Sequence, residues 1–126
     1  MNYIPLIGRI LFSLIFLMSP LWHFSEQTIL SATEKGIPKA SLLVPLASVI
    51  AFLGALSTIL GYKAKIGALL IILFLISASF LMHNFWAISD PLAQQIQKAM
   101  FMKNIALLGG ALFILYWGSG PMSLDN

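Results

Sequence analysis

The side chains most able to do chemistry in this chain are concentrated in one stretch, from Met82 to Asn104. His83 and Trp86 lie near its start. An imidazole titrates close to neutral pH, so His83 could hydrogen-bond a quinone carbonyl or shuttle a proton. The indole of Trp86 could stack on a flat ring. The alternative is an interfacial belt, in which both side chains anchor a helix at the depth of the lipid headgroups.

Three further polar residues belong to this candidate site: Asn84, Lys103 and Asn104. The two amides would orient polar groups of a ligand, and Lys103 would attract an anionic headgroup or a semiquinone. For the amides the simpler alternative is hydrogen bonding between neighbouring helices. The sequence predicts a ligand site made of His83, Asn84, Trp86, Lys103 and Asn104, and it assigns no catalytic residue.

The elements that position these residues must lie in a membrane. Of the 126 residues, 60% are hydrophobic and 9% are charged, and the mean hydropathy is +0.95. Soluble domains contain roughly 45–50% apolar and about 25% charged residues. A net charge of +3 is too small to indicate nucleic-acid binding. With no cysteine, two histidines and four acidic residues, the chain predicts neither thiol chemistry nor a metal site.

Four apolar blocks are each close to the ~20 residues that a helix needs to cross a bilayer. They cover residues 4–24, 42–62, 66–88 and 100–117. Helices are favoured because a lone span must satisfy its own backbone hydrogen bonds. The sequence therefore predicts an all-α integral membrane protein, formed as a single bundle of four transmembrane helices over residues 1–126.

A short interfacial helix is predicted after the first span, over residues 25–35. Ser25 is its candidate N-cap and Gly36 its C-terminal stop. The last span has a similar signal, because Asp90 is an acidic N-cap followed by Pro91 at the first helical position. This span is expected to begin as an amphipathic helix in the interface.

Small residues and short connections predict how the spans pack against one another. Ala47, Ala51 and Ala55 recur at four-residue spacing and predict a packing seam on the second span. The turn around Lys63 and Lys65 is so short that the second and third spans must be antiparallel neighbours. On a helix that continues from the third span through Asp90, His83 and Trp86 would share a face with Asp90.

Four spans place both termini and the Lys63–Lys65 turn on the same side of the membrane. The pair of lysines in that turn favours a cytoplasmic side for the termini, by the positive-inside rule. Arg9 also lies near that side, inside the first span. Asp125 is the acidic residue expected there, so we predict an ion pair between Arg9 and Asp125 that ties the tail to the first span.

An ordered series of short motifs extends along nearly the whole chain. They are Gly8-Arg9-Ile10-Leu11-Phe12, Lys35-Gly36-Ile37-Pro38, Leu60-Gly61-Tyr62-Lys63-Ala64-Lys65, His83-Asn84-Phe85-Trp86, Phe101-Met102-Lys103-Asn104, Gly118-Ser119-Gly120-Pro121 and Ser123-Leu124-Asp125. The series resembles the DoxX family of small bacterial and archaeal membrane proteins. The resemblance implies a four-helix membrane bundle. It also implies a quinone-linked redox role, since the family takes its name from a subunit associated with a thiosulfate:quinone oxidoreductase.

One departure from that family bears on catalysis. Many DoxX proteins have an acidic residue in the second span just before a glycine pair, where this chain has Ala51-Phe52-Leu53-Gly54-Ala55 and therefore no acid.

The expectation is a bacterial inner-membrane protein, an accessory or quinone-proximal subunit that contacts lipid and a redox partner subunit, with quinone as the candidate cofactor. The alternative is a non-catalytic membrane scaffold or a small-solute carrier, and the sequence does not decide whether the chain is an enzyme.

Overall fold

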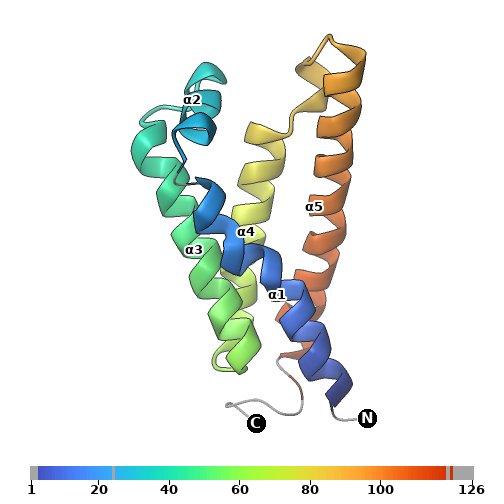
Figure 1. The fold of residues 1–126 in the computed structure, drawn as a ribbon. Coiled ribbons are helices and arrows are strands. Elements are labelled where there is room, and N and C mark those ends of the chain that lie inside the picture. Colours follow the sequence, from blue (N-terminus) through green and yellow to red (C-terminus); the bar gives the residue numbers. More distant parts are fainter. Residues whose placement is uncertain (1–2, 24, 119, 121–126) are drawn as a thin grey trace.

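The computed structural model describes residues 3–23, 25–118 and 120, with the side chains of 21–23 excepted. Its elements are α1 (Tyr3–His23), α2 (Glu26–Glu34), α3 (Ala40–Leu60), α4 (Ala64–Met82), a 3₁₀ turn η1 (Phe85–Ala87) and α5 (Pro91–Trp117) (Figure 1). All these elements are helical, so the all-α prediction is confirmed.

The long helices follow one another in space in the order α1, α3, α4, α5. The start of α1, the α3–α4 turn and the end of α5 lie at one end of the bundle, and α2 and the start of α5 lie at the other (Figure 1). We call the second of these the α2 end. A shared core contains Phe16 of α1, Ala51 of α3, Leu75 of α4 and Ala111 of α5.

Helices α3 and α4 approach each other closely at Gly54 and Gly67. A Cβ atom added to Gly54 would lie 2.7 Å from the carbonyl oxygen of Gly67, and one added to Gly67 would lie 2.8 Å from that of Gly54. Ala51 and Ala55 of the predicted seam are fully buried beside this contact, whereas Ala47 is only partly buried. Small residues let the backbones approach, which is how helices associate in lipid.

The predicted turn between α3 and α4 is confirmed, and its backbone conformation explains its sharpness. Gly61 and Lys63 both have positive φ, at +70° and +51°. The Ser57 hydroxyl donates a hydrogen bond shared by the carbonyl oxygens of Tyr62 and Lys63, which ties the turn to the last turn of α3.

Both predicted helix starts are also confirmed. The Ser25 side chain accepts a hydrogen bond from the Thr28 amide at 3.3 Å, and the Asp90 carboxylate accepts one from the Ala93 amide at 2.9 Å. Gly36 follows α2 with φ of +86°, as its C-terminal stop requires.

The helix of the third span does not continue through the polar cluster to Asp90. α4 ends at Met82, and His83 leaves the helix with φ −118° and ψ 41°. The chain turns there before η1, so His83, Trp86 and Asp90 do not lie on one continuing helix. No glycine or proline marks this end in the sequence.

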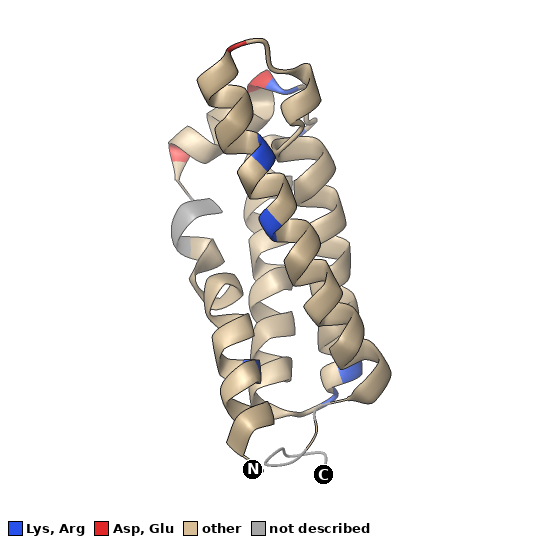
Figure 2. Ribbon diagram, turned by 90° about the vertical axis from the view of Figure 1, so that its right-hand side faces the viewer, with Lys and Arg blue, Asp and Glu red and all other residues tan. Residues whose placement is uncertain are grey.

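Within the described residues, three helical segments are long and apolar enough to cross a membrane: Ala40–Leu60, Ala64–Ala87 and Pro91–Trp117. In α1 the apolar helix within the described residues is the shorter segment Tyr3–Leu17. The four-span prediction is therefore not confirmed, and the first span stays a prediction. Between the lysines of α5 and the basic residues near the α3–α4 turn, the described residues leave an uncharged band across the bundle (Figure 2).

Candidate functional site

A cavity of about 380 Å³ opens at the α2 end, between α1, α2, α4 and α5. Its volume is within the ~300–1,000 Å³ of typical small-molecule sites. One part of its wall is apolar. Seven residues form this part: Ile15, Phe16, Phe74, Leu75, Ala78, Met82 and Leu107.

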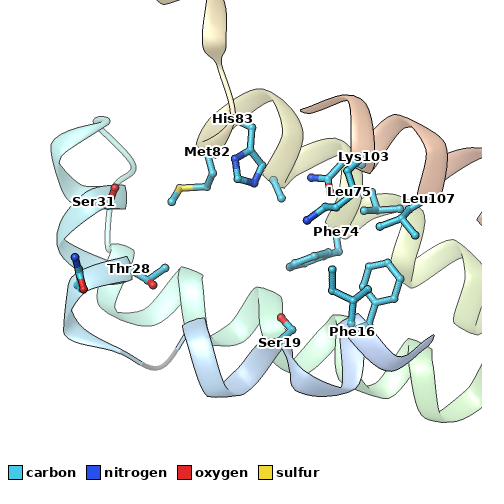
Figure 3. A pocket seen from close by; sticks show the side chains of 14 residues that line it. Phe16, Ser19, Thr28, Ser31, Phe74, Leu75, Met82, His83, Lys103 and Leu107 are labelled. Atoms are coloured by element: carbon cyan, nitrogen blue, oxygen red, sulfur yellow. The ribbon is translucent and has the colours of Figure 1, made fainter. Parts of the chain in front are cut away.

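The rest of the wall is polar and comes from two sides. Ser19 of α1 lies opposite His83 and Lys103, and Thr28 and Ser31 of α2 close a further side (Figure 3). Gln27 and Asn104 complete the polar set. An apolar wall with a few converging polar groups is the usual form of a small-molecule site.

His83 is held in place by the start of α5. Its Nδ1 lies 2.7 Å from Oε1 of Gln97. Because an amide oxygen only accepts hydrogen bonds, Nδ1 donates, and the hydrogen bond fixes the orientation of the ring. The irregular backbone at His83 directs the side chain to this partner, since the residue no longer follows the helical path of α4.

Lys103 and Asn104 are neighbours on α5 but differ in exposure. Asn104 is buried, with 6% of its surface exposed, whereas Lys103 is exposed and its Nζ lies 3.8 Å from Sδ of Met100. Among the described residues that line the cavity, Lys103 is the only Lys, Arg, Asp or Glu. The cavity wall therefore carries a positive charge that no lining carboxylate offsets.

The other two candidate residues lie away from this cavity. Asn84 accepts a hydrogen bond from Lys35 Nζ at 3.0 Å, which joins the end of α2 to the segment after α4. Trp86 is 54% exposed and packs edge-on against Phe85 and Phe101. The structure thus brings together His83, Lys103 and Asn104 of the predicted site, and separates Asn84 and Trp86 from them.

Sequence reasoning missed the contribution of α1 and α2 to the cavity. Ser19, Gln27, Thr28 and Ser31 look like ordinary polar residues of a helix end and of an interfacial helix. The available signal was spacing, since Thr28 and Ser31 lie three apart and share a face of α2. That signal does not say which face is covered, because α2 is placed by its packing on α3 through buried Ala32.

Comparison with known proteins places this chain in a family. The family model described as "SURF4 family" matches residues 1–126. The chain belongs to the SURF4 family. The resemblance to the DoxX family is therefore wrong, because the family model that matches residues 1–126 is that of the SURF4 family.

Three relatives show how this SURF4-family chain compares in length. It is 27% identical to the Surfeit locus protein 4 homolog of Schizosaccharomyces pombe, over 99% of this chain and 37% of that protein. It is 27% identical to the inner membrane protein YqjF of Escherichia coli, over 96% of this chain and 88% of that protein. It is 26% identical to the ER-derived vesicles protein ERV29 of Saccharomyces cerevisiae, over 62% of this chain and 25% of that protein. No solved structure matches.

Arg9 of this SURF4-family chain lies at the opposite end from the cavity. It is buried, with 4% of its surface exposed, and Nη2 donates a hydrogen bond to the carbonyl oxygen of Ile59 at 3.5 Å. Asp125, its predicted partner, lies outside the described residues, so the Arg9–Asp125 pair stays a prediction.

Proposed function

We propose that this SURF4-family membrane protein binds an anionic amphiphile in the cavity at the α2 end. The polar head of the ligand lies among His83, Lys103 and Asn104, and its hydrocarbon part lies against Phe16 and Leu75. The observation that carries this proposal is the composition of the wall, which joins an uncompensated lysine and several hydrogen-bonding groups to a continuous apolar surface.

The position of the polar groups fits such a ligand. His83 directly follows α4 and Lys103 lies in the first half of α5, so both belong to the half of the bundle nearer the α2 end, toward which lipid headgroups would be found. His83 is oriented by Gln97, so a hydrogen-bonding group is already placed before the ligand arrives. Preorganisation of this kind lowers the entropy cost of binding.

The buried hydroxyls favour binding at one end over passage of ions through the bundle. Ser48 and Thr58 each bond to a carbonyl oxygen of their own helix, at 2.7 Å and 2.9 Å. The hydroxyls of Ser13 and Ser79 are also buried, without a hydrogen-bond partner among the described residues. None of these four side chains is charged, so they offer no charged relay. The quinone-proximal role considered for His83 and Trp86 has lost two of its supports, because Trp86 does not line the cavity and the chain belongs to the SURF4 family instead of the DoxX family.

We place the protein in a bacterial cytoplasmic membrane, with both termini on the cytoplasmic side. The name of the YqjF relative, an inner membrane protein, supports the choice of the cytoplasmic membrane. The lysines of the α3–α4 turn support the cytoplasmic location of the termini, by the positive-inside rule. In this orientation the cavity opens toward the outer leaflet.

The test compares lipids that differ in headgroup charge. The purified protein in detergent is titrated with phosphatidylglycerol or phosphatidylcholine, and bound lipid is counted by native mass spectrometry. We expect tighter binding of phosphatidylglycerol. Lys103→Met should weaken it about fivefold, because a lysine near an anionic lipid surface contributes about 1 kcal/mol.

Lys98→Met is the matched control, since Lys98 lies on the same helix but does not line the cavity. It should leave the affinity for phosphatidylglycerol unchanged. Glycerol phosphate, added as a competitor, separates a lipid headgroup from a free phosphate ester. Equal binding of the two lipids by the unaltered protein, or displacement by glycerol phosphate as efficient as by lipid, would contradict the proposal.

A further inference from the structure

A second cavity lies beside the first, between α3 and α4. It has a volume of about 290 Å³, with Val44, Ala47 and Ile50 on the α3 side and Leu81 on the α4 side. Ser77 is the only polar residue among the described residues that line it. A charged or strongly polar head would lose its hydrogen bonds here, whereas a hydrocarbon chain would not.

The two cavities share one strip of wall. Phe74, Ala78 and Met82 line both of them. These residues are spaced by four along α4, so they form a ridge on a single face of the helix. Phe74 and Met82 stand at the two ends of this ridge in the view of Figure 3. Between them Ala78 contributes only a methyl group, which leaves the ridge low in the middle.

We propose that the ligand is an anionic lipid with two hydrocarbon chains, one held in the first cavity and the other crossing the ridge at Ala78 into the second cavity. This inference rests on the function proposed above and specifies its ligand class. A glycerolipid joins its two chains next to the headgroup, so chains that diverge directly below the head suit two cavities that meet at one ridge.

The charge distribution fixes the direction in which such a lipid lies. Lys103, His83 and Asn104 all belong to the first cavity, and none of the described residues that line the second is charged. The head is therefore held in the first cavity, and only a chain can enter the second. A single-chain amphiphile would occupy the first cavity and place no hydrocarbon chain in the second.

The experiment compares lipids that differ only in the number of chains. Phosphatidylglycerol with two palmitoyl chains and lysophosphatidylglycerol with one are titrated against the same purified protein, in the same detergent, by native mass spectrometry. We expect the two-chain lipid to bind at least about threefold tighter, because the second chain adds close packing contacts even when it comes from an apolar environment.

Variants on the second cavity show where that preference arises. Ala47→Phe fills the cavity and should remove the preference while leaving lysophosphatidylglycerol binding unchanged. Ala47→Leu is a milder substitution and should reduce the preference in the same direction. Val49→Phe is the matched control, since Val49 is 39% exposed on the same helix and lines neither cavity. It should keep the preference.

The outcomes separate this inference from the proposal on which it rests. Equal affinities for the two lipids would overturn the two-chain inference and leave an anionic amphiphile as the ligand. A preference that survives both Ala47→Phe and Ala47→Leu would also overturn it, because the second chain would then lie elsewhere. Failure of both lipids to bind would overturn the proposed function and this inference together.

Discussion

At the scale of single residues, Gly54 is the position where one added methyl group has the clearest consequence. Its Cβ would lie 2.7 Å from the Gly67 carbonyl oxygen and 2.9 Å from Ile71 Cγ1. The carbonyl is part of a helix backbone and cannot move aside alone, so α3 and α4 must separate. We expect Gly54→Ala to destabilise the fold by about 1–3 kcal/mol, the usual cost of overpacking. Unfolding in increasing dodecyl sulfate, followed by circular dichroism, measures this.

Gly109→Ala is the control, because nothing lies within 4 Å of a Cβ atom at this position of α5. Replacing a helical glycine by alanine is itself favourable by up to about 1 kcal/mol. Gly109→Ala should therefore be neutral or slightly stabilising, in contrast to Gly54→Ala. If both variants unfold like the unaltered protein, the close α3–α4 contact is not a source of stability.

The residues of the candidate site were predictable only where a polar side chain stands out in an apolar sequence. His83, Lys103 and Asn104 are polar residues in an apolar chain, and this contrast led directly to them. Asn84 and Trp86 belong to the same sequence cluster, but the backbone turns after Met82 and takes them elsewhere. Ser19 carried no signal, because a serine in a membrane helix usually satisfies its own hydrogen bonds.

At the scale of elements, helix starts were predictable and one helix end was not. A start depends on a local hydrogen bond from a capping side chain, and Ser25 and Asp90 both make it. The end of α4 has no such local mark. It follows from the contacts of the next segment, in which His83 bonds to Gln97 and Gln94 donates to the Phe85 carbonyl at 3.3 Å. Gln94 and Gln97 belong to α5, so the residues before Met82 cannot indicate where α4 ends.

α2 is the element whose position controls access to the first cavity. Buried Ala32 packs it on α3, and Lys35 Nζ joins it to Asn84 Oδ1 at 3.0 Å. We expect Asn84→Ala to let α2 move away from the cavity more often. In a Ser31→Cys background this should raise the rate of maleimide labelling up to about fivefold, since such a hydrogen bond contributes about 1 kcal/mol. The chain has no other cysteine, so the label reports one site.

Asn84→Asp separates the hydrogen bond from the size of the side chain, because aspartate keeps an oxygen acceptor for Lys35. The Ser31→Cys protein should therefore still be labelled slowly when it also carries Asn84→Asp. Glu34→Cys, at an exposed position of the same helix, should be labelled at the same rate with Asn84, Asn84→Ala or Asn84→Asp. Fast labelling with Asn84→Asp, or no change with Asn84→Ala, would show that Lys35 and Asn84 do not hold α2.

At the scale of the whole molecule, the membrane class followed from composition, but the number of spans did not. α3, the segment from α4 to Ala87, and α5 each meet the length and hydropathy of a span, whereas the apolar segment of α1 is shorter. α1 nevertheless packs along α3 and contributes Phe16 to the shared core. Packing on α3 does not by itself make α1 a membrane span, so the first span stays a prediction.

The position of α1 makes a definite prediction about the two faces of the membrane. If α1 crosses the bilayer, its start lies on the same side as the α3–α4 turn, and α2 lies on the other side. Three single-cysteine variants at exposed positions, Tyr3→Cys, Lys65→Cys and Glu34→Cys, test this in intact cells with a membrane-impermeant maleimide. We expect Glu34→Cys to react at once and the other two only after permeabilisation, because the lysines of the turn favour the cytoplasm. Reaction of Tyr3→Cys from the same side as Glu34→Cys would show that α1 does not span the membrane. Lys65→Cys would still report the side of the turn, since α3 separates it from α2 in either case.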